Sequence, residues 1–450
     1  MRQEDCVMEK IKKVLLENGT AEAVLFTLIL MSRFLWNSVY TEFVTPTGRD
    51  VRCFRYFMLF TFFLAFGLLA GKMICRLFTG QWNKPANSSV VLTLFTLMVL
   101  ISSYVNYGNA MFHEESIYMN LLETMLVTLC FYHYAKEMKE ERVQSVLTVN
   151  GYFILVLVFL LSALSLGVYF FAGDSFTLFG RAYQKMDLIN IGHGETNRYY
   201  GFFGYPTVAG FRVMLAAVLS LHLVQKKKLP VIFAAGMLVI AAVVIVLADA
   251  RSGMILFALT MVFVFVRLLV TKAKMTAKKA VMTMMIPAVF CVLAVLVIKR
   301  DAVLGVLSAF AGNSQADAEI LSSRGTLISE CVRMGLEKPL TGFGWHAGIL
   351  YLDNSHNLFA NLLAWTGFVG LGLFLVFLIF ALKEAYGKKS LIPANPYLLC
   401  LLLCVFIQAN LDKAILGEMH NPETYLFWLC LGLFALGTQD SKREREGKPS

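Results

Sequence analysis

Three side chains that are far apart in the sequence could together carry out one reaction. Arg251 lies in the stretch LADARSG, Arg324 in SSRGTLISECVRMGLEKP and His356 in DNSHNLFANLLAWTG. Guanidinium groups present planar, forked donors that match phosphate oxygens, and they stay charged at physiological pH. A neutral imidazole, with an ordinary pKa of about 6.5, accepts a proton from an attacking hydroxyl. The combination suits group transfer from a phosphate-activated substrate.

The segment around Arg324 predicts a short helix that Ser322 or Ser323 caps, with Pro339 and the following glycines ending it. Arg324 would then lie in the first turn, where free backbone N–H groups and the helix dipole favour an anion. Two arginines and a helix start could hold a pyrophosphate and stabilise the charge that develops as it leaves. Such a site needs no metal ion and no cofactor.

Polar neighbours of His356 extend the candidate site. Asp353 or Asn357 could orient the imidazole ring, and Asn357 and Asn361 are four positions apart on one helix face, where they could donate hydrogen bonds to a sugar. Histidines elsewhere show no HExxH spacing and no clustered carboxylates, so the sequence predicts no metal site.

Each of these residues also has an ordinary structural interpretation. An arginine at the end of a membrane span, such as Arg251, is commonly an interfacial anchor. Arg324 could pair with Glu319 or Glu330 on a solvated face, and a histidine at a helix mouth can be structural. The functional hypothesis therefore depends on the joint occurrence of the three.

The composition of the chain indicates the class of protein that must position them. The 450 residues are 58% hydrophobic, and apolar runs of a length that crosses a hydrocarbon layer recur throughout. Runs such as VIFAAGMLVIAAVVIVLA lack the alternation of a barrel strand. We predict an all-α polytopic membrane protein.

The hydropathy pattern predicts about twelve transmembrane helices in one membrane domain, 21–438. The net charge of +10 is concentrated in short loops between spans, as the positive-inside rule requires, rather than in a surface for nucleic acid. This distribution places both termini in the cytoplasm. The predicted spans are 21–39, 56–71, 88–106, 117–135, 146–172, 205–224, 230–248, 252–266, 280–298, 358–382, 391–411 and 423–438.

Four further segments complete the predicted organisation. A charged cytoplasmic lead-in (1–20) precedes the first span, and a basic cytoplasmic tail (439–450) follows the last. Two long extracytoplasmic loops, 173–204 and 299–357, bring Arg324 and His356 to the side of the membrane that also carries Arg251. Nine cysteines are scattered without a disulfide framework, although Cys53 and Cys331 could pair on the outer side.

Several stretches, taken together, resemble the bacterial O-antigen ligase and Wzy-type polysaccharide polymerase superfamily. NRYYGFFGYPTVAGF is similar to its Arg-Gly-Phe then Pro segment, and DARSG resembles its short Ser-Arg-Gly turn. SSRGTLISECVRMGLEKPLTGFGW resembles its arginine-bearing helix that ends in Pro-Leu-x-Gly-x-Gly. SHNLFANLLAWTGFVGLGLFL is similar to its His-Asn-x-x-Leu followed by Gly-x-x-Gly-Leu.

The resemblance implies a GT-C-like fold and a metal-independent, inverting glycosyltransferase in the bacterial cytoplasmic membrane. The donor would be an undecaprenyl-pyrophosphate-linked oligosaccharide and the acceptor a sugar hydroxyl of a glycan or lipid-linked glycan, transferred on the extracytoplasmic side. By this analogy Arg251 and Arg324 bind the pyrophosphate and His356 activates the acceptor. Arg198 and Arg212, with Asp353, Asn357 and Asn361, are the predicted substrate-binding residues.

Other functions stay open at this point. A ligase transfers a finished chain once, whereas a polymerase repeats the transfer, and no residue separates the two. A lipid-linked oligosaccharide flippase or polysaccharide transporter also fits twelve spans, but transporters tend to show related halves and ionisable residues near the midplane. A partner for other polysaccharide-assembly proteins is a third reading.

Overall fold

The computed structural model describes most of the helical part of the chain. The described residues are 20–35, 60, 63, 64, 67, 70, 71, 74, 86–106, 131–133, 135, 136, 140–178, 181–191, 197–272, 315–345, 347, 355–386, 395–411 and 422–435.

Apolar runs form most of the described helices, and a proline marks the start of four of them. Pro206, Pro396 and Pro422 are the first residues of their helices and Pro230 precedes another, positions where a missing N–H costs no hydrogen bond. The helices are α2 (Thr20–Leu35), α4 (Asn87–Val105), α7 (Glu140–Phe171), α8 (Pro206–Gln225), α9 (Val231–Leu247), α10 (Arg251–Lys272), α13 (Gln315–Glu337), α14 (Leu358–Tyr386), α16 (Pro396–Leu411) and α17 (Pro422–Ala435).

The prediction of a helical membrane protein is confirmed. Five of the described helices, α4, α7, α8, α10 and α14, are long and apolar enough to cross a membrane. Four more predicted spans coincide with the shorter apolar helices α2, α9, α16 and α17. The predicted spans 56–71, 117–135 and 280–298 lie largely or wholly outside the described residues. The total of twelve and the sidedness therefore remain predictions.

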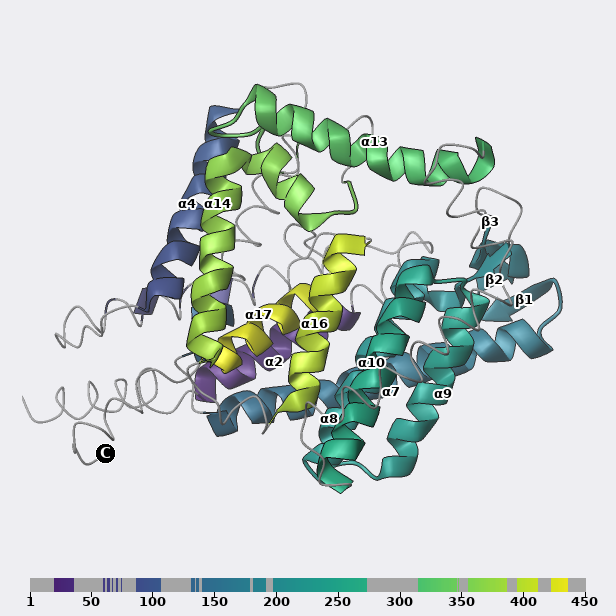
Figure 1. Cartoon of the computed structure of the whole chain (residues 1–450). Helices are drawn as coiled ribbons and strands as arrows, with labels where there is room; N and C mark the ends of the chain where they lie inside the picture. Colours follow the sequence, from purple (N-terminus) through teal and green to yellow (C-terminus); the bar gives the residue numbers. More distant parts are fainter. Residues whose placement is uncertain are drawn as a thin grey trace, which may run out of the picture.

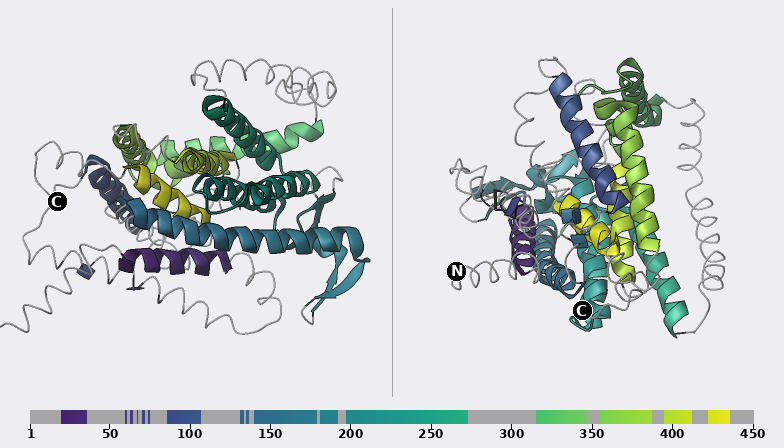
Figure 2. Two further views of the ribbon diagram at one scale, coloured as in Figure 1. Left: turned by 90° about the horizontal axis from the view of Figure 1, so that it is seen from below. Right: turned by 90° about the vertical axis from the view of Figure 1, so that its left-hand side faces the viewer.

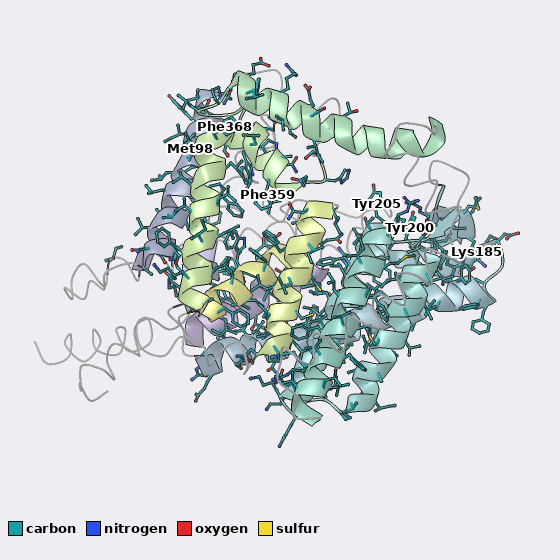
Figure 3. All side chains as sticks on the ribbon, in the orientation of Figure 1. Met98, Lys185, Tyr200, Tyr205, Phe359 and Phe368 are labelled. Atoms are coloured by element: carbon teal, nitrogen blue, oxygen red, sulfur yellow. The ribbon has the colours of Figure 1, made fainter. Side chains whose placement is uncertain are left out.

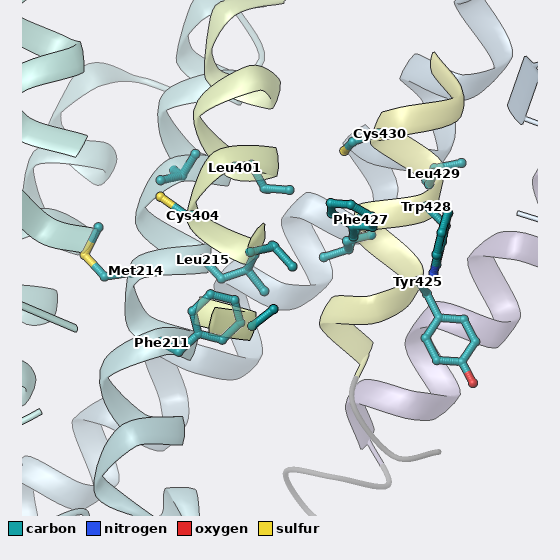
Figure 4. Close-up of a cluster of buried hydrophobic side chains, with 14 of the residues drawn as sticks. Phe211, Met214, Leu215, Leu401, Cys404, Tyr425, Phe427, Trp428, Leu429 and Cys430 are labelled. Carbon is teal, nitrogen blue, oxygen red and sulfur yellow. The ribbon is translucent and has the colours of Figure 1, made fainter. Parts of the chain in front are cut away.

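The helices pack into a bundle with α13 lying across one end (Figure 1). We call this end of the bundle the α13 end. Helix α14 packs along α4, as the side view also shows (Figure 2), and beneath α13. Helix α8 is the central element on the other side, in contact with α7, α9, α10 and α16. In the core, Phe211 and Leu215 of α8 lie near Leu401 and Cys404 of α16, with the aromatic side chains of α17 beyond (Figure 4).

A buried polar cluster joins α4 to α14 at the opposite end of the bundle. The N–H and hydroxyl of Ser88, in the first turn of α4, donate to the Glu384 carboxylate at 3.2 and 2.7 Å. Lys136 Nζ lies 2.5 Å from the same carboxylate. A carboxylate at a helix start satisfies free N–H groups and complements the dipole. Glu384 therefore fixes the end of α14 to the beginning of α4.

The predicted loop 173–204 contains two small antiparallel hairpins, which the prediction of an all-α protein did not include. They are β1 (Ser175–Leu178) with β2 (Arg181–Gln184), and β3 (Ile189–Ile191) with β4 (Asn197–Tyr199). Two short 3-10 turns, Lys185–Leu188 and Gly201–Phe203, flank the second hairpin. Strands of three or four residues show too little alternation for a sequence to reveal, and cross-strand pairs such as Phe176 stacked on Tyr183 hold them.

The helix that carries Arg324 begins earlier than predicted. Helix α13 starts at Gln315 and runs without interruption to Glu337, so neither Ser322 nor Ser323 caps it. Arg324 lies in the middle of the helix rather than in its first turn. The prediction that a helix start assists Arg324 was therefore wrong.

Candidate functional site

Arg251 is the first residue of α10, directly after a tight turn from α9. Asp249 in this turn has φ +43°, and the backbone N–H groups of the turn donate hydrogen bonds to the last carbonyls of α9. Two glycines seat the turn against α8. A Cβ on Gly210 would lie 2.7 Å from the Cβ of Ala250, and one on Gly253 would lie 3.2 Å from the Cα of Gly210. The glycines of TVAGF and DARSG thus let the start of α10 approach α8 closely, leaving Arg251 exposed.

Arg198, in β4, is brought to the same turn. Its Nε lies 3.5 Å from Oδ2 of Asp249, and the two side chains are 24% and 40% exposed. The segment that carries Arg198 is anchored on α7, because the Tyr199 hydroxyl donates to the Ser165 carbonyl at 2.6 Å and the N–H of Phe202 donates to the Ser165 hydroxyl at 3.0 Å. Burial, assisted by the neighbouring Tyr169, raises the pKa of Tyr199. Two of the predicted cations therefore adjoin one turn.

His356 lies two residues before the first residue of α14, at the helix end where it was predicted, and its backbone has φ +56°. A histidine in the left-handed region is uncommon, so the neighbouring contacts must hold it there. The N–H and hydroxyl of Ser355 each donate to Oδ1 of Asn361 at 2.8 Å. Asn357 caps α14 by accepting the N–H of Ala360 at 3.0 Å.

Asn361 is completely buried, at 0% exposure. The N–H of Ser355 can only donate, which fixes Oδ1 as the atom that faces it. The thiol of Cys331 in α13 lies 3.9 Å from the same oxygen, and burial raises the pKa of that thiol to about 11. Asn361 thus connects α13 to the His356 segment. Its Oδ1 is occupied by these contacts, and a contact of Asn361 with a sugar stays a prediction.

The residues after α13 are bound into a break in α14. At Gly367 the backbone has φ +65° and ψ −169°, so the helix changes direction there. Two carbonyls freed at the break accept hydrogen bonds from the residues after α13. The Phe343 N–H donates to Ala364 O at 2.9 Å, and the Gly344 N–H donates to Trp365 O at 3.0 Å. In return the N–H of Phe368 donates to Pro339 O at 2.8 Å. Figure 3 labels Phe359 and Phe368, which lie on either side of the break.

The end of α4 clamps the same segment with polar side chains that the sequence interpretation missed. Asn106 Nδ2 donates to Gly342 O at 3.0 Å, and its Oδ1 accepts Lys338 Nζ at 2.6 Å. The hydroxyl of Ser102 lies within hydrogen-bonding distance of the carbonyls of Thr341 and Trp365, at 2.5 and 2.6 Å. Buried polar residues in an apolar span were the signal that could have found them.

The remaining predicted residues differ in how far they are described. Arg212 lies inside α8 and is 2% exposed, so in this structure it is enclosed by protein rather than by lipid. The side chain of Arg324 and the whole of Asp353 lie outside the described residues. Cys331 is a free, buried cysteine, and the Cys53 with which it could pair lies outside the described residues. Within the described part of the chain, no group of three His, Cys, Asp or Glu side chains is arranged to hold a metal ion.

The helix that carries Arg324 packs directly on α14, which His356 precedes, and α10, which begins at Arg251, is connected to α14 through α16. The first segment of α14 lies beneath α13, and Phe359 in that segment contacts Phe406 of α16 with ring centroids 6.0 Å apart (Figure 1). Helix α16 in turn packs against α8 and α10. The sequence model of the O-antigen ligase family matches residues 236–375. This match confirms the predicted resemblance to the O-antigen ligase and Wzy-type superfamily.

The O-antigen ligase match contains α10, α13 and the broken first half of α14, and with them Arg251, Arg324 and His356. Arg198 and Arg212 precede it. Neither the curated proteins nor the solved structures provide a significant match to the chain. The described helices and this match together support a helical membrane protein with an O-antigen ligase-like role in polysaccharide assembly.

Proposed function

We propose that the protein is a membrane glycosyltransferase that moves a glycan from an undecaprenyl-pyrophosphate donor to an acceptor sugar hydroxyl. The observation that supports the proposal most directly is that the O-antigen ligase match encloses Arg251, Arg324 and His356. The site would face the extracytoplasmic side of the bacterial cytoplasmic membrane, as the distribution of basic loops predicts.

Arg251 and Arg324 are the proposed pyrophosphate ligands. Arg251 opens α10, so the free N–H groups of a helix start adjoin this guanidinium and not that of Arg324. Arg198 supplies a third guanidinium at the same turn, because it pairs with Asp249, which lies two positions before Arg251 in the sequence. A group of fixed donors favours the charge that develops on the leaving pyrophosphate. Arg212, enclosed in α8, remains a proposed substrate ligand.

His356 is the proposed general base, and the contacts around it support a positioning role for its neighbours. Ser355, Asn357 and Asn361 fix the backbone on both sides of the imidazole. We therefore propose that Asn357 and Asn361 act by holding His356 rather than by binding sugar. Asp353 remains the proposed partner that orients the ring.

The reaction is a direct displacement. His356 accepts the proton of the acceptor hydroxyl, the hydroxyl oxygen bonds to the anomeric carbon, and the bond from that carbon to the pyrophosphate oxygen breaks. The electron pair leaves with undecaprenyl pyrophosphate, and attack from the opposite face inverts the anomeric centre. Arginine donors supply the electrostatic stabilisation without a metal ion or cofactor.

Reconstitution of the full chain with an undecaprenyl-pyrophosphate oligosaccharide and an acceptor glycan tests the proposal. Arg251→Ala, Arg324→Ala and His356→Ala should each abolish glycan transfer while membrane insertion is retained. Arg333→Ala is the matched control for Arg324→Ala, since Arg333 is an exposed arginine of α13 that pairs with Glu330 and Glu337. It should leave transfer unchanged.

The products separate the remaining possibilities. A ladder of lengths identifies a polymerase, and a single transfer to a second acceptor identifies a ligase. Movement of the lipid-linked glycan across the bilayer without a new glycosidic bond identifies a flippase and rejects the proposal. Normal transfer by all three alanine variants rejects the residue assignment.

A further inference from the structure

Helix α13 has a buried face that packs on the first segment of α14. Leu327, Cys331 and Met334 are buried on this face. Gly335 brings the two helices together, since a Cβ there would lie 2.4 Å from Cγ of Leu363. This contact accounts for one part of the apolar surface of α13.

A second apolar surface lies beside the buried face and is open. Ile328, Val332, Leu336 and Leu340 recur every four residues, and the last two are 63% and 68% exposed. Residues four apart lie on one side of a helix, so the first three form a stripe that Leu340 continues beyond the end of α13. We call these four residues the apolar flank.

Three charged residues in the described second half of α13, Glu330, Arg333 and Glu337, lie on the other side of the buried face. Arg333 pairs with Glu330 at 2.6 Å and with Glu337 at 2.8 Å. The Arg333 guanidinium holds the pKa of the Glu330 carboxyl below its usual range. Successive residues of a helix are 100° apart around its axis. Going around α13, the buried face lies between the charged residues and the apolar flank on one side, and Ser329 lies between them on the other. A helix with separated apolar and charged sides is typical of a membrane surface.

The apolar flank is continuous with the surface of the membrane-spanning helices. The N–H of Phe368 donates to Pro339 O, which places Phe368 beside Leu340, and Phe368 and Val369 are exposed on α14. Ser102 and Asn106, at the end of α4, contact Thr341 and Gly342. The end of α13 therefore lies at the level where α4, a helix apolar enough to span the membrane, stops.

We propose that the apolar flank of α13 enters the hydrocarbon edge of the bilayer leaflet, with the Glu330–Arg333–Glu337 side in water. Exposed leucines at the level of the span ends lose contact with water when they enter acyl chains. Helix α13 is then an in-plane helix whose depth is set by lipid on one side and by α14 on the other. The proposal concerns the lipid surface and does not depend on the reaction.

Quenching of a genetically encoded fluorescent amino acid tests the position of the two sides. The probe is placed at 332 or 336 in the full chain, with 333 as the matched position on the charged side, and the protein is reconstituted in phosphatidylglycerol and phosphatidylethanolamine vesicles. Lipids with a nitroxide near the top of the acyl chain should quench positions 332 and 336 about twofold more than 333. Aqueous iodide should show the opposite order.

Equal quenching by iodide at 332 and 333 overturns the proposal, because the flank would then lie in water. Protection of 332 and 336 from both quenchers also overturns it, because protein would then cover the flank. A benzophenone amino acid at 336 gives a second measurement: lipid adducts support the proposal, and adducts with polypeptide reject it.

Discussion

The Nε of Arg198, in β4, lies 3.5 Å from Oδ2 of Asp249, in the turn that precedes Arg251. The two residues are separated by all of α8 and α9 in the sequence and meet at the α13 end of the bundle. Asp249 therefore offsets positive charge at the place where a pyrophosphate is proposed to bind.

Replacing Asp249 with asparagine should strengthen donor binding. Asparagine tolerates the left-handed backbone of this position as aspartate does, so only the charge is lost. One negative charge fewer near the donor should lower its apparent KM by roughly fivefold at low salt. High salt should reduce this gain, since the pair is partly exposed. Transfer rates at varied donor concentration provide the measurement.

Asp249→Ala is the control for the backbone. Alanine is strained at positive φ, so this variant should lose about 1 kcal/mol of stability, whereas Asp249→Asn should unfold at nearly the same temperature as the parent. A raised KM in the asparagine variant would mean that Asp249 assists the donor site instead of competing with the donor.

Gly367→Ala should destabilise the protein more than the same change a little further along α14. At Gly367 the backbone conformation is one that only glycine adopts readily, and a Cβ would lie 2.6 Å from Pro339 O. The strain should cost about 1–3 kcal/mol. Gly372 is the matched control, because a Cβ there meets nothing within 4 Å and alanine should add roughly 0.5–1 kcal/mol. Thermal unfolding in detergent compares the two variants.

The spans were predictable because their signals lie within each segment: an apolar run as long as the hydrocarbon layer is thick, and a proline at the helix start. The predicted span 205–224 corresponds to Pro206–Gln225 and 230–248 to Val231–Leu247, where Pro206, Pro230 and the lysines between the helices set the ends. The start of α13 was misplaced because Ser322 and Ser323 resemble a cap. The preceding residues QADAEIL, with two alanines, a glutamate and a leucine, continue the helix.

The break in α14 and the burial of Asn361 were not predictable because distant residues create them. The apolar run through Gly367 reads as one helix, and the partners of the freed carbonyls come from Phe343 and Gly344. An asparagine near a helix start suggests a ligand, but α13 covers it and Ser355 occupies its oxygen. The choice of Arg251, Arg324 and His356 from the sequence still awaits a test.

Cys331 should resist alkylation in the folded protein. The thiolate is the nucleophile, and burial raises the pKa of this thiol to about 11, so little thiolate forms at pH 8. An introduced cysteine at Ser329, an exposed position on the same helix, is the control with ordinary reactivity. Mass spectrometry of the α13 peptide should show modification of position 331 at least roughly 100-fold slower. Equal rates would mean that α13 separates readily from α14.

Asn361→Ala should lower kcat and leave the donor KM nearly unchanged. The variant loses the oxygen that holds Ser355 but removes no guanidinium. Misplacement of a catalytic group by about 1 Å costs on the order of 100-fold in rate. Ser355→Ala loses the hydroxyl contact and keeps the N–H contact, so its kcat should fall less. Thr366→Val removes a buried hydroxyl of α14 that donates to the Leu362 carbonyl of the same helix, and should leave kcat unchanged.

A double-mutant cycle separates positioning from general destabilisation. If Asn361 acts through His356, then Asn361→Ala should cause no further loss of transfer in a His356→Gln background that retains measurable activity. Additive losses would show that Asn361 contributes by another route, such as holding α13 through Cys331. Thermal unfolding of each variant determines whether the folded fraction is the same, so that a fall in rate reflects the position of the imidazole and not the amount of active protein.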